Sequence, residues 1–380
     1  MSYFLTEEQE LIRDAAREFA ETQVKPQARA LDATHEFPWD WVNQCAELGF
    51  LGVSVPSEYG GAGADCVSEM LVIEEIARFS GALALIIDAH TSLGCMPLLH
   101  AGTEEQKQKY LVPAAQGKNL MSFGLTEPNA GSDAGGTVST AVLDGDEWVL
   151  NGEKAWITNI QAAKTYIATF VTDPGKGTKG ISAFIIEDGT PGFRCGEPQA
   201  KMGLHNSFTG SLFFQDCRIP KENLLGELNR GFPVFMQGLD EGRLAVSAMA
   251  VGMAQGAMEQ AIDYAKQREQ FGKTIVSFQA IQFMIAEMAI EIEAARCLLY
   301  NAARLRDAGL PYTKQAAMLK AFSSEMCLRV VDKSLQIHGG NGYSADYDIE
   351  RFYRDAKLLT IGEGTSEINR VVVAGHVIGR

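Results

Sequence analysis

The sequence lacks the signals of several large classes of protein. Its 33 Lys and Arg residues are outnumbered by 48 Asp and Glu, and the net charge of -15 leaves no basic surface for general binding of nucleic acid or anionic membranes. None of the seven cysteines belongs to a C-x-x-C pair, which argues against a disulfide framework and against a zinc site. The chain also has no P-loop and no G-x-G-x-x-G that opens a helix. We therefore expect no metal, no nucleic acid and no membrane partner.

Targeting signals are absent as well. The N-terminal segment has no basic stretch followed by an apolar one, and we find no apolar run of the roughly 18 residues that a membrane span needs. These two absences predict a cytoplasmic protein. With 46% hydrophobic residues over 380 positions, the chain has enough apolar material for two or three packed units.

The hydrophobic periodicity divides the chain into three regions. Residues 1–120 have the spacing of helices, and TEEQ, Thr6 to Gln9, has the pattern of a helix-capping box. Residues 121–230 alternate with a period near two, and Asn151-Gly152 within EWVLNGEKAWIT predicts the turn of a hairpin. Residues 231–380 return to long helical segments with broad apolar faces. The predicted class is α+β, in the order helical domain, β domain, helical bundle.

Two segments of the predicted β domain combine residues that suit a polar ligand. FGLTEPNAGSD, residues 123–133, is a loop of turn-forming and hydroxyl residues that can offer backbone N–H groups to an anion or to a polar ring edge. In KAWITN, Trp156 and Thr158 are two positions apart, so in a strand the ring and the hydroxyl share one face. Taken singly, each segment is equally typical of an ordinary surface turn or a core tryptophan.

A third segment, TIGEGTSEINR, places one carboxylate between two glycines. Glu363 lies between Gly362 and Gly364, immediately before an apolar, helix-like run. Glycine allows the backbone to approach another group closely. An acid at this position is either a reactive carboxylate or a residue that stabilises the start of a helix through its dipole.

In this order, the segments resemble signatures of the acyl-CoA dehydrogenase family of flavoproteins, and the resemblance covers essentially the whole chain. The segments that carry it are FGLTEPNAGSD, WITN, QDCRIPKENLLGE, REQFGK, FQAIQF, QIHGGNGY, RDAK and GEGTSEINR. The resemblance implies a β-barrel-like central domain, a C-terminal four-helix bundle, FAD as cofactor and a homotetramer built as a dimer of dimers. It also implies an acyl-CoA substrate and electron-transfer flavoprotein as the electron acceptor.

The same resemblance implies which residues contact FAD. Trp156 packs on one face of the flavin and Thr158 bonds near its N5 atom, whereas Arg268 and Gln279 reach the adenine and pyrophosphate end from a partner subunit. This is chemically reasonable, because an arginine neutralises a pyrophosphate and paired glycines let backbone amides approach it. The full set of expected flavin contacts is Phe123, Leu125, Thr126, Gly131, Ser132, Trp156, Ile157, Thr158, Arg268, Gln270, Phe271, Gln279, Gln336, Gly339, Gly340, Thr365 and Glu367.

For the coenzyme A thioester, the resemblance implies contacts from Ser132, Asp240, Arg243 and Gly364. Asp240 and Arg243 are three positions apart on a predicted helix and therefore share a face. Their alternative role is a surface ion pair, which would stabilise the fold very little. Spacing alone leaves both roles open.

Glu363 is the residue that we expect to remove the α-proton while the β-hydrogen leaves as hydride to flavin N5. Burial beside an apolar acyl chain should raise the pKa of Glu363 towards the working pH. We expect Gly362 and Gly364 to let the loop press its backbone against the thioester. Some relatives carry the base on the first bundle helix, where this chain has Gly242, and Glu241 would point about 100° away from that position.

The acyl group is predicted from two departures from the commoner family pattern. Gly362 stands where many straight-chain members have an aromatic residue, which leaves room near the thioester. LALIIDAHTSLGCMPLL, which resembles the wall of the acyl pocket, carries Asp88 and His90 close to Leu93, and polar groups there disfavour a long polymethylene chain. We expect a short, branched or alicyclic acyl group such as cyclohexanecarboxyl, with butyryl as the fallback and Asp88 as a polar contact or second proton acceptor. The competing interpretation is that Asp88 and His90 face solvent or bond to their surroundings.

Three other functions stay open at this point. The same chemistry in reverse would make the chain an enoyl-CoA reductase, because sequence does not set the direction of the reaction. An oxygen-using oxidase is disfavoured because such chains are usually longer. A non-catalytic flavoprotein scaffold would have no need of Glu363, Trp156 and Thr158 together.

Overall fold

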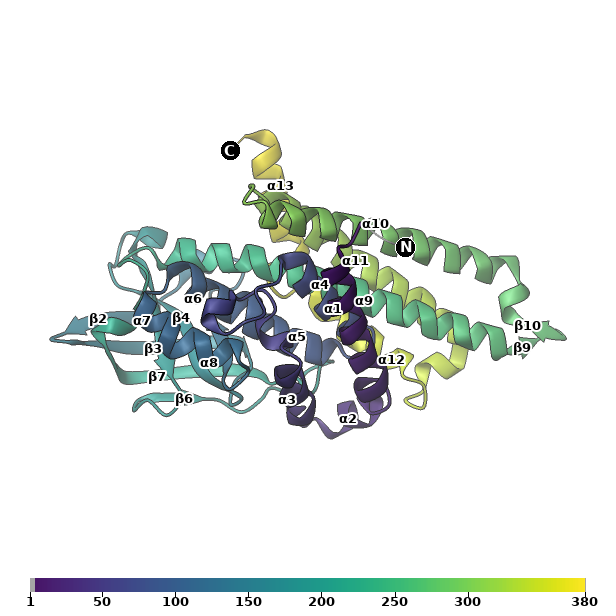
Figure 1. Cartoon of the computed structure of the whole chain (residues 1–380), viewed down its shortest axis with the longest axis horizontal. Helices are drawn as coiled ribbons and strands as arrows, with labels where there is room; N and C mark the ends of the chain where they lie inside the picture. The colour runs from purple at the N-terminus through teal and green to yellow at the C-terminus, as the bar shows by residue number, and fades with distance from the viewer. Residues whose placement is uncertain (1–3, 380) are drawn as a thin grey trace.

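The computed structural model describes residues 4–379 and consists of three parts (Figure 1). A sheet lies at the left of Figure 1, a helical bundle extends to the right, and the N-terminal helices lie across the middle. The predicted α+β class, with helical regions on both sides of a sheet-rich region in the sequence, is therefore confirmed.

The N-terminal part is built from short helices joined by tight turns. Helix α1 (Glu7–Phe19) begins at the predicted capping box: the hydroxyl of Thr6 accepts the backbone N–H of Gln9 at 3.2 Å, and Gln9 Oε1 accepts that of Thr6 at 2.9 Å. Because both N–H groups are satisfied, the start of the helix is fixed. The other helical elements are η1 (Ala20–Val24), α2 (Ala28–Thr34), α3 (Trp39–Glu47), η2 (Phe50–Gly52), η3 (Ser57–Tyr59), α4 (Cys66–Ala77), α5 (Gly81–His90), η4 (Thr91–Cys95), α6 (Met96–Ala101), α7 (Glu104–Gln106), η5 (Lys107–Leu111) and α8 (Val112–Ala115).

The segment Gly81–Ala101, which contains α5, η4 and α6, corrects one expectation. By length and composition it could cross a membrane, with a mean hydropathy of 1.5, although we identified no such run from the sequence. The most apolar window of this segment is 94% buried inside the protein, and a core helix of a soluble protein passes the same test. This segment packs against α4, α9 and β1, so other parts of the protein cover most of its faces. This burial explains why those faces are apolar.

The central part is one eight-stranded sheet in which most neighbours are antiparallel. The strands are β1 (Leu120–Gly124), β2 (Thr140–Asp144), β3 (Glu147–Thr158), β4 (Ala163–Val171), β5 (Ile181–Glu187), β6 (Phe193–Cys195), β7 (Thr209–Pro220) and β8 (Leu224–Leu225). Their order is β6-β7-β3-β2-β4-β5-β8, with β1 parallel to β4. Three short 3₁₀ turns lie on the connections of this region, η6 (Ala134–Gly136), η7 (Gly177–Gly180) and η8 (Lys221–Asn223).

The predicted hairpin turn at Asn151-Gly152 is wrong. β3 runs straight through both residues, and the turn that joins β2 to β3 is two residues, Gly145 and Asp146, between Asp144 and Glu147. Asn151 instead exchanges two hydrogen bonds with Asp216 of β7, at 2.8 and 3.1 Å. Gly152 marks an irregularity in the β3–β7 ladder, where a Cβ would lie 2.2 Å from Ser139 Oγ. An Asn-Gly pair therefore serves here as a bulge, which needs a glycine for close approach as a turn does.

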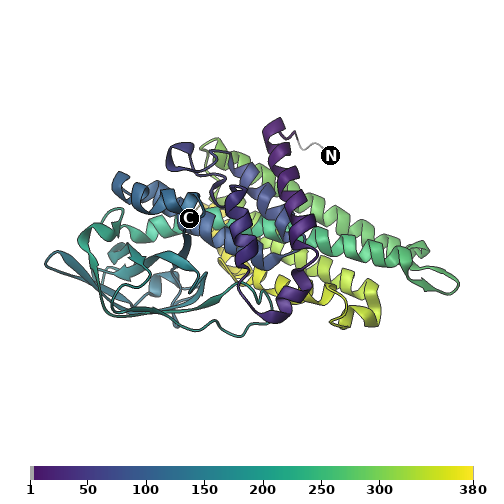
Figure 2. The same cartoon turned by 60° about the horizontal axis from the view of Figure 1, so that its bottom comes forward.

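The C-terminal part is a helical bundle arranged around one long helix. Helix α9 (Gly231–Gln267) has 37 residues, which gives it a length of about 55 Å. It begins beside β5 and packs along α4 and α11. At its far end the hairpin of β9 (Glu269–Gln270) and β10 (Lys273–Thr274) projects beyond the other helices in both views (Figures 1 and 2). The remaining elements are η9 (Ile275–Ser277), α10 (Gln279–Asp307), α11 (Thr313–His338), η10 (Gly339–Tyr343), α12 (Ile349–Ala356), η11 (Lys357–Thr360) and α13 (Ser366–Ile378).

Candidate active site

Glu363 lies in the turn between η11 and α13, in a strained backbone conformation. Its φ is 53° and that of Gly364 is 92°, so both residues are left-handed. A residue with a side chain is disfavoured in this region by roughly 1–2 kcal/mol. Gly362 has no left-handed φ, and a Cβ there would lie 3.6 Å from its nearest neighbour. The left-handed strain therefore falls on Glu363 and not on Gly362, and the expectation that Gly362 allows close approach to the thioester stays a prediction.

The carbonyl of Gly364 holds this turn in place. It accepts hydrogen bonds from Lys320 Nζ of α11 at 2.5 Å and from Asn369 Nδ2 of α13 at 2.9 Å. Thr365 caps α13, because its hydroxyl accepts the backbone N–H of Ile368 at 3.2 Å. Sequence analysis missed Lys320, whose one signal was a charged residue within an otherwise apolar helix segment.

The carboxylate of Glu363 lies over Gly242 of α9. A Cβ built at Gly242 would stand 2.3 Å from Glu363 Oε2 and 2.8 Å from Leu93 Cδ2 of η4. The missing side chain thus makes room for the carboxylate and for the apolar wall beside it. Glu241 is directed elsewhere, with its carboxylate 3.1 Å from Arg306 Nε and 3.6 Å from His100 Nε2.

The buried carboxyl group of Asp88 in α5 faces the half-buried Glu363. Asp88 is 0% exposed. Burial raises the pKa of Asp88 well above its usual range, and the neighbouring negative charge of Glu363 raises it further. Burial also raises the pKa of Glu363, as the sequence predicts, but its interaction with Asp88 and the charges of Lys320 and Arg243 oppose that shift. Two negative charges so close together out of water are unfavourable, so Asp88, whose pKa is raised further, holds a proton and Glu363 is the charged member.

His90, the other polar residue expected near the acyl chain, has a structural role. Its Nδ1 accepts the backbone N–H of Met121 at 3.0 Å, and its Nε2 lies 3.1 Å from the carbonyl oxygen of Leu51. Both ring nitrogens are thus occupied, and burial lowers the pKa of His90 to about 4. The interpretation that Asp88 and His90 face solvent is wrong for both, because neither is exposed, whereas bonding to the surroundings is correct for His90.

Asp240 and Arg243 form a buried pair rather than a surface one. Arg243 Nη1 donates to Asp240 Oδ1 at 2.6 Å, and the two side chains are 7% and 13% exposed. The hydroxyl of Thr313 donates to the other oxygen of Asp240, also at 2.6 Å. Arg243 Nε is buried and has no protein partner among the described residues. The pair therefore closes one side of the Glu363 region and leaves one donor unused.

The first group of expected flavin contacts gathers at the ends of β1 and β3. The backbone N–H of Ala155 donates to the carbonyl of Thr126 at 2.8 Å, and the hydroxyl of Ser122 donates to that of Thr158 at 2.6 Å. Trp156 is 61% exposed and has a left-handed φ of 61° at an irregularity of the strand. The members of this group are Phe123, Leu125, Thr126, Gly131, Ser132, Trp156, Ile157 and Thr158.

A buried ion pair, which the sequence analysis also missed, holds the loop of this group. Lys154 Nζ of β3 lies 2.7 Å from Glu127 Oε1, and the side chains are 0% and 2% exposed. The same carboxylate accepts the backbone N–H groups of Val138 and Ser139. The loop that carries Ser132 is thereby held at both ends against the strand that carries Trp156.

The second group of expected flavin contacts lies at the far end of the bundle. Tyr264 of α9 stacks on His338 of α11 with centroids 4.4 Å apart, and its hydroxyl accepts Asn341 Nδ2 at 2.9 Å, which brings the ends of the two helices together. All members of this group are exposed, and Phe271 at the hairpin tip is 93% exposed. They are Arg268, Gln270, Phe271, Gln279, Gln336, Gly339 and Gly340.

One chain does not bring the two groups together. Phe123 of the first group stacks on Phe235 near the start of α9, with centroids 4.1 Å apart, whereas Arg268 directly follows the end of that helix. The helix between Phe235 and Arg268 is about 50 Å long. A single FAD cannot contact both groups of the same chain.

Comparison with known families covers all three parts of the structure. The acyl-CoA dehydrogenase N-terminal domain matches residues 6–118, the middle domain residues 122–217, and the C-terminal domain residues 229–378. Together these matches span nearly the whole chain. The chain belongs to the acyl-CoA dehydrogenase family. It is an oxidoreductase that acts on CH–CH groups, and its cofactor is FAD.

Relatives of this acyl-CoA dehydrogenase resemble it along their full length. A short-chain-specific acyl-CoA dehydrogenase of Clostridium acetobutylicum is 46% identical, over 99% of this chain and 100% of the relative. A subunit of the caffeyl-CoA reductase–Etf complex of Acetobacterium woodii is 45% identical, over 99% of each. The solved structure of butyryl-CoA dehydrogenase from Megasphaera elsdenii is 42% identical, with a TM-score of 0.97 over 100% of both chains.

The residues of each group suit a part of FAD. Trp156 presents an exposed ring beside a loop rich in hydroxyl and backbone donors, which suits the flavin. Gly339 and Gly340 have nothing within 4 Å of an added Cβ, so their backbone is open to a pyrophosphate. Thr365 and Glu367 lie at the start of α13, close in sequence to Glu363.

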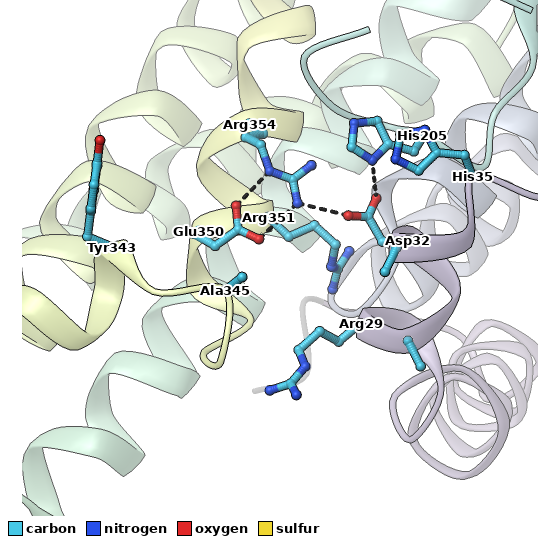
Figure 3. A pocket seen from close by; sticks show the side chains of 11 residues that line it. Arg29, Asp32, His35, His205, Tyr343, Ala345, Glu350, Arg351 and Arg354 are labelled. Carbon is cyan, nitrogen blue, oxygen red and sulfur yellow. Dashed lines mark hydrogen bonds and ion pairs between the residues drawn. The ribbon is translucent and has the colours of Figure 1, made fainter. Parts of the chain in front are cut away.

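A separate surface cavity of about 610 Å³ lies between α2, α12 and the loop of His205 (Figure 3). The charged side chains around it satisfy one another: Arg354 contacts Asp32 at 2.8 Å and Glu350 at 2.6 Å, and His205 lies 3.3 Å from Asp32. No residue expected to bind FAD or acyl-CoA lines it. The dehydrogenase uses this cluster to join its N-terminal helices to the bundle.

Proposed function

We propose that this chain oxidises a short or compact acyl-CoA to the 2-enoyl-CoA, with Glu363 as the base and electron-transfer flavoprotein as the electron acceptor. The observation that carries the proposal is the position of the Glu363 carboxylate, which lies over Gly242 and beside Leu93 and faces the buried Asp88. A scaffold protein would gain nothing from holding an ionised carboxylate in this strained and desolvated turn.

In this mechanism Glu363 removes the α-proton of the thioester. Its raised pKa makes it a stronger base than an exposed glutamate. The backbone N–H of Glu363 has no protein acceptor among residues 4–379 and can therefore donate to the thioester carbonyl, where negative charge develops as the proton leaves. When bound, FAD accepts the β-hydrogen as hydride, so that the two hydrogens leave as a proton and a hydride and the C=C bond forms.

The size of the acyl group follows from the residues around this carboxylate. Leu93 offers an apolar wall, and Gly362 adds no bulk. Asp88 places a neutral carboxyl group in the same region, where contact with a long polymethylene chain would be costly. We propose an alicyclic substrate such as cyclohexanecarboxyl-CoA, with butyryl-CoA as the fallback and Asp88, because it is protonated, as a polar contact rather than as a second proton acceptor. The names of the short-chain-specific relative and of the butyryl-CoA dehydrogenase support the short range.

The electron acceptor and the direction are supported by one relative. The Acetobacterium subunit belongs by name to a reductase–Etf complex, which links this kind of chain both to electron-transfer flavoprotein and to the reverse reaction. Reduction of an enoyl-CoA is therefore the second candidate function. It would use the same Glu363, which would then return a proton to the α-carbon.

An oligomer is proposed from two observations. The two groups of flavin contacts lie too far apart for one cofactor within a chain, so a second copy must supply Arg268 and its neighbours. In addition, α10 exposes an apolar stripe, with Phe283 58%, Ile290 69% and Leu298 38% exposed. An apolar stripe on a long helix favours helix packing between subunits, as in the expected dimer of dimers.

A panel of acyl-CoA thioesters tests the proposed function. Each is added anaerobically to the FAD-loaded protein, and bleaching of the flavin is followed with cyclohexanecarboxyl-, butyryl-, glutaryl- and palmitoyl-CoA. The proposal expects bleaching by one of the first two and little by the last two. Efficient bleaching by palmitoyl-CoA would contradict the compact pocket, and bleaching by none would favour the scaffold.

A further inference from the structure

Lys320 is a fully buried lysine on the face of α11 that meets the Glu363 turn. Its side chain is 0% exposed, and Nζ donates to the carbonyl of Gly364 at 2.5 Å. Placing an ammonium group out of water is costly unless it is paired. Asn369 already donates to the same carbonyl at 2.9 Å, so the hydrogen bond alone does not account for the charge.

The charges that face Lys320 come from three other elements. Glu363 in the turn and Glu367 of α13 act on it as negative charges, and Arg243 of α9 acts as a positive one. Arg243 is already paired with Asp240. Among the described residues, no carboxylate oxygen lies within 4 Å of Lys320 Nζ. Lys320 is therefore a cation without a salt-bridge partner of its own, next to the charged member of the carboxyl pair.

We propose that Lys320 is a positioning residue for Glu363: it fixes the left-handed Gly364 peptide, and its charge keeps Glu363 ionised while Asp88 retains the shared proton. This rests on the proposed role of Glu363 as the base. Lys320 contacts the peptide next to the base and not the reacting atoms, so it acts through Glu363.

The titration of these groups supports the same division of charge. Burial lowers the pKa of Lys320 to about 8, although Glu363 opposes the shift, so the ammonium form prevails at neutral pH. Lys320 and Arg243 lower the pKa of Glu363, whereas no cation contributes to that of Asp88. Removing Lys320 should therefore raise the pKa of Glu363 and leave less of it ionised at neutral pH.

Replacement of Lys320 by Met in the FAD-loaded protein tests the proposal. We measure the rate of flavin reduction by the best acyl-CoA of the panel from about pH 6 to about pH 10, with Lys320→Gln alongside to retain a neutral donor. For Met we expect a rate ~10-fold lower near pH 7 that recovers at high pH. The reason is that the pH at which the rate rises, as Glu363 becomes ionised, should increase by about one unit. The KM should change little, and Gln should show the same shift.

The melting temperature distinguishes this role from a purely structural one, because replacing a lysine that only stabilises the fold would lower it. Lys320→Met removes a desolvated charge and leaves Gly364 bonded to Asn369, so the melting temperature of the FAD-loaded protein should stay the same or rise. Lys333→Met serves as the matched control, because Lys333 is on the same helix and pairs with Glu287 and Glu291 at the surface. Its pH profile should not shift.

Two outcomes would overturn the inference. A rate lowered equally at every pH together with a lower melting temperature would assign Lys320 to folding alone, and an unchanged profile would remove any role. Glu363→Gln is measured in the same series to separate the two hypotheses. If it still reduces the flavin normally, the proposed base is wrong; if it is inactive while Lys320→Met behaves like wild type, only the present inference fails.

Discussion

The carboxyl cluster around Glu363 and the flavin contacts are assembled in opposite ways. The cluster joins side chains of α5, α9, α11 and the turn before α13 within one chain; Asp88, Arg243 and Lys320 are buried, and Glu363 is half-buried. The flavin contacts form two groups at opposite ends of α9 (Figure 1). The group at the hairpin end is exposed throughout, and the group at the sheet end is largely buried except for Trp156 and the loop that carries Ser132. Folding alone therefore completes the acid–base geometry, whereas we infer that the cofactor site is complete only after subunits associate.

Loss of the base is expected to give the largest effect, because Asp88, the other carboxyl group of the cluster, already holds a proton and cannot accept one in place of Glu363. Glu363→Gln should slow flavin reduction by acyl-CoA by at least ~100-fold while FAD content and oligomeric state are unchanged. Stopped-flow reduction together with size-exclusion chromatography measures both. Glu325→Gln, a change in a carboxylate that pairs with Arg370 at the surface, is the control and should alter the rate less than about twofold. A Glu363→Gln enzyme of near-normal rate would move the base elsewhere.

The first group of flavin contacts, at the ends of β1 and β3, should depend on a buried charge for its stability, as the Glu363 cluster depends on one for its reactivity. Glu127→Gln leaves Lys154 buried without its counter-ion and should lower the free energy of unfolding by about 3 kcal/mol. Asp188→Asn, which breaks the exposed pair with Lys164, should cost less than about 0.5 kcal/mol. Urea unfolding of both variants compares them. Equal losses would show that burial of the first pair is energetically unimportant.

The same pair predicts how stability depends on acid. Burial raises the pKa of Glu127, but the charge and hydrogen bond of Lys154 outweigh it and bring the pKa down to about 2, from an ordinary value of 4.5. Because the folded state holds the proton more weakly than the unfolded state, this contribution is complete above about pH 4.5 and is lost as the pH falls towards 2. Glu127→Gln should therefore flatten the decline in stability over that range.

FAD binding by the second group of flavin contacts, next to the β9–β10 hairpin, should depend on protein dilution rather than on acid. Arg268→Ala removes a charged donor from the exposed end of α9 and should weaken FAD retention by roughly tenfold, with parallel loss of the oligomer. Flavin fluorescence and sedimentation, both measured over a dilution series, test the coupling. Lys266→Ala, a change two positions earlier on the same helix end, is the matched control and should retain FAD like wild type. A diluted monomer that keeps its FAD would contradict the inference that the cofactor site is complete only after subunits associate.

Acyl-chain selection should show the smallest effect. Gly362→Tyr places a ring near the thioester and should lower the rate with cyclohexanecarboxyl-CoA relative to butyryl-CoA by roughly five- to tenfold. The variant should fold, because a Cβ at this position meets its nearest neighbour at 3.6 Å. Gly362→Ala is the control, and its ratio of rates with cyclohexanecarboxyl-CoA and butyryl-CoA should stay within about twofold of the wild-type ratio. Equal losses with both substrates would exclude a role of Gly362 in selecting bulk.

Local signals in the sequence predicted local structure well. The capping box at Thr6 and the change from helical to alternating periodicity were sufficient for the start of α1 and for the order of the three parts. Asn151-Gly152 misled because a turn and a bulge both need a glycine, and only the pairing of Asn151 with Asp216 of a distant strand distinguishes them.

Long-range contacts decided what could not be predicted at the site. Glu363 was found because its own segment is distinctive, but Lys320 contacts the turn across 44 positions and its segment is an ordinary helix. Gly242 was predicted only to lack a base, and the structure adds that its missing side chain makes space for the carboxylate of another element. Both depend on how helices pack, which periodicity does not specify.

The left-handed conformation of Glu363 has a consequence for how this position would drift under mutation. Glycine at 363 would adopt the same φ of 53° without steric strain, so a lineage selected only for folding would lose the glutamate and gain stability. Such a chain would keep its helices, its sheet and its FAD contacts. Among members that, like this chain, have a glycine at position 242, residue 363 is thus the position where one that has abandoned the reaction can be told apart from one that performs it. Glu363→Gly, measured for melting temperature and rate together, recreates that divergence in a single step.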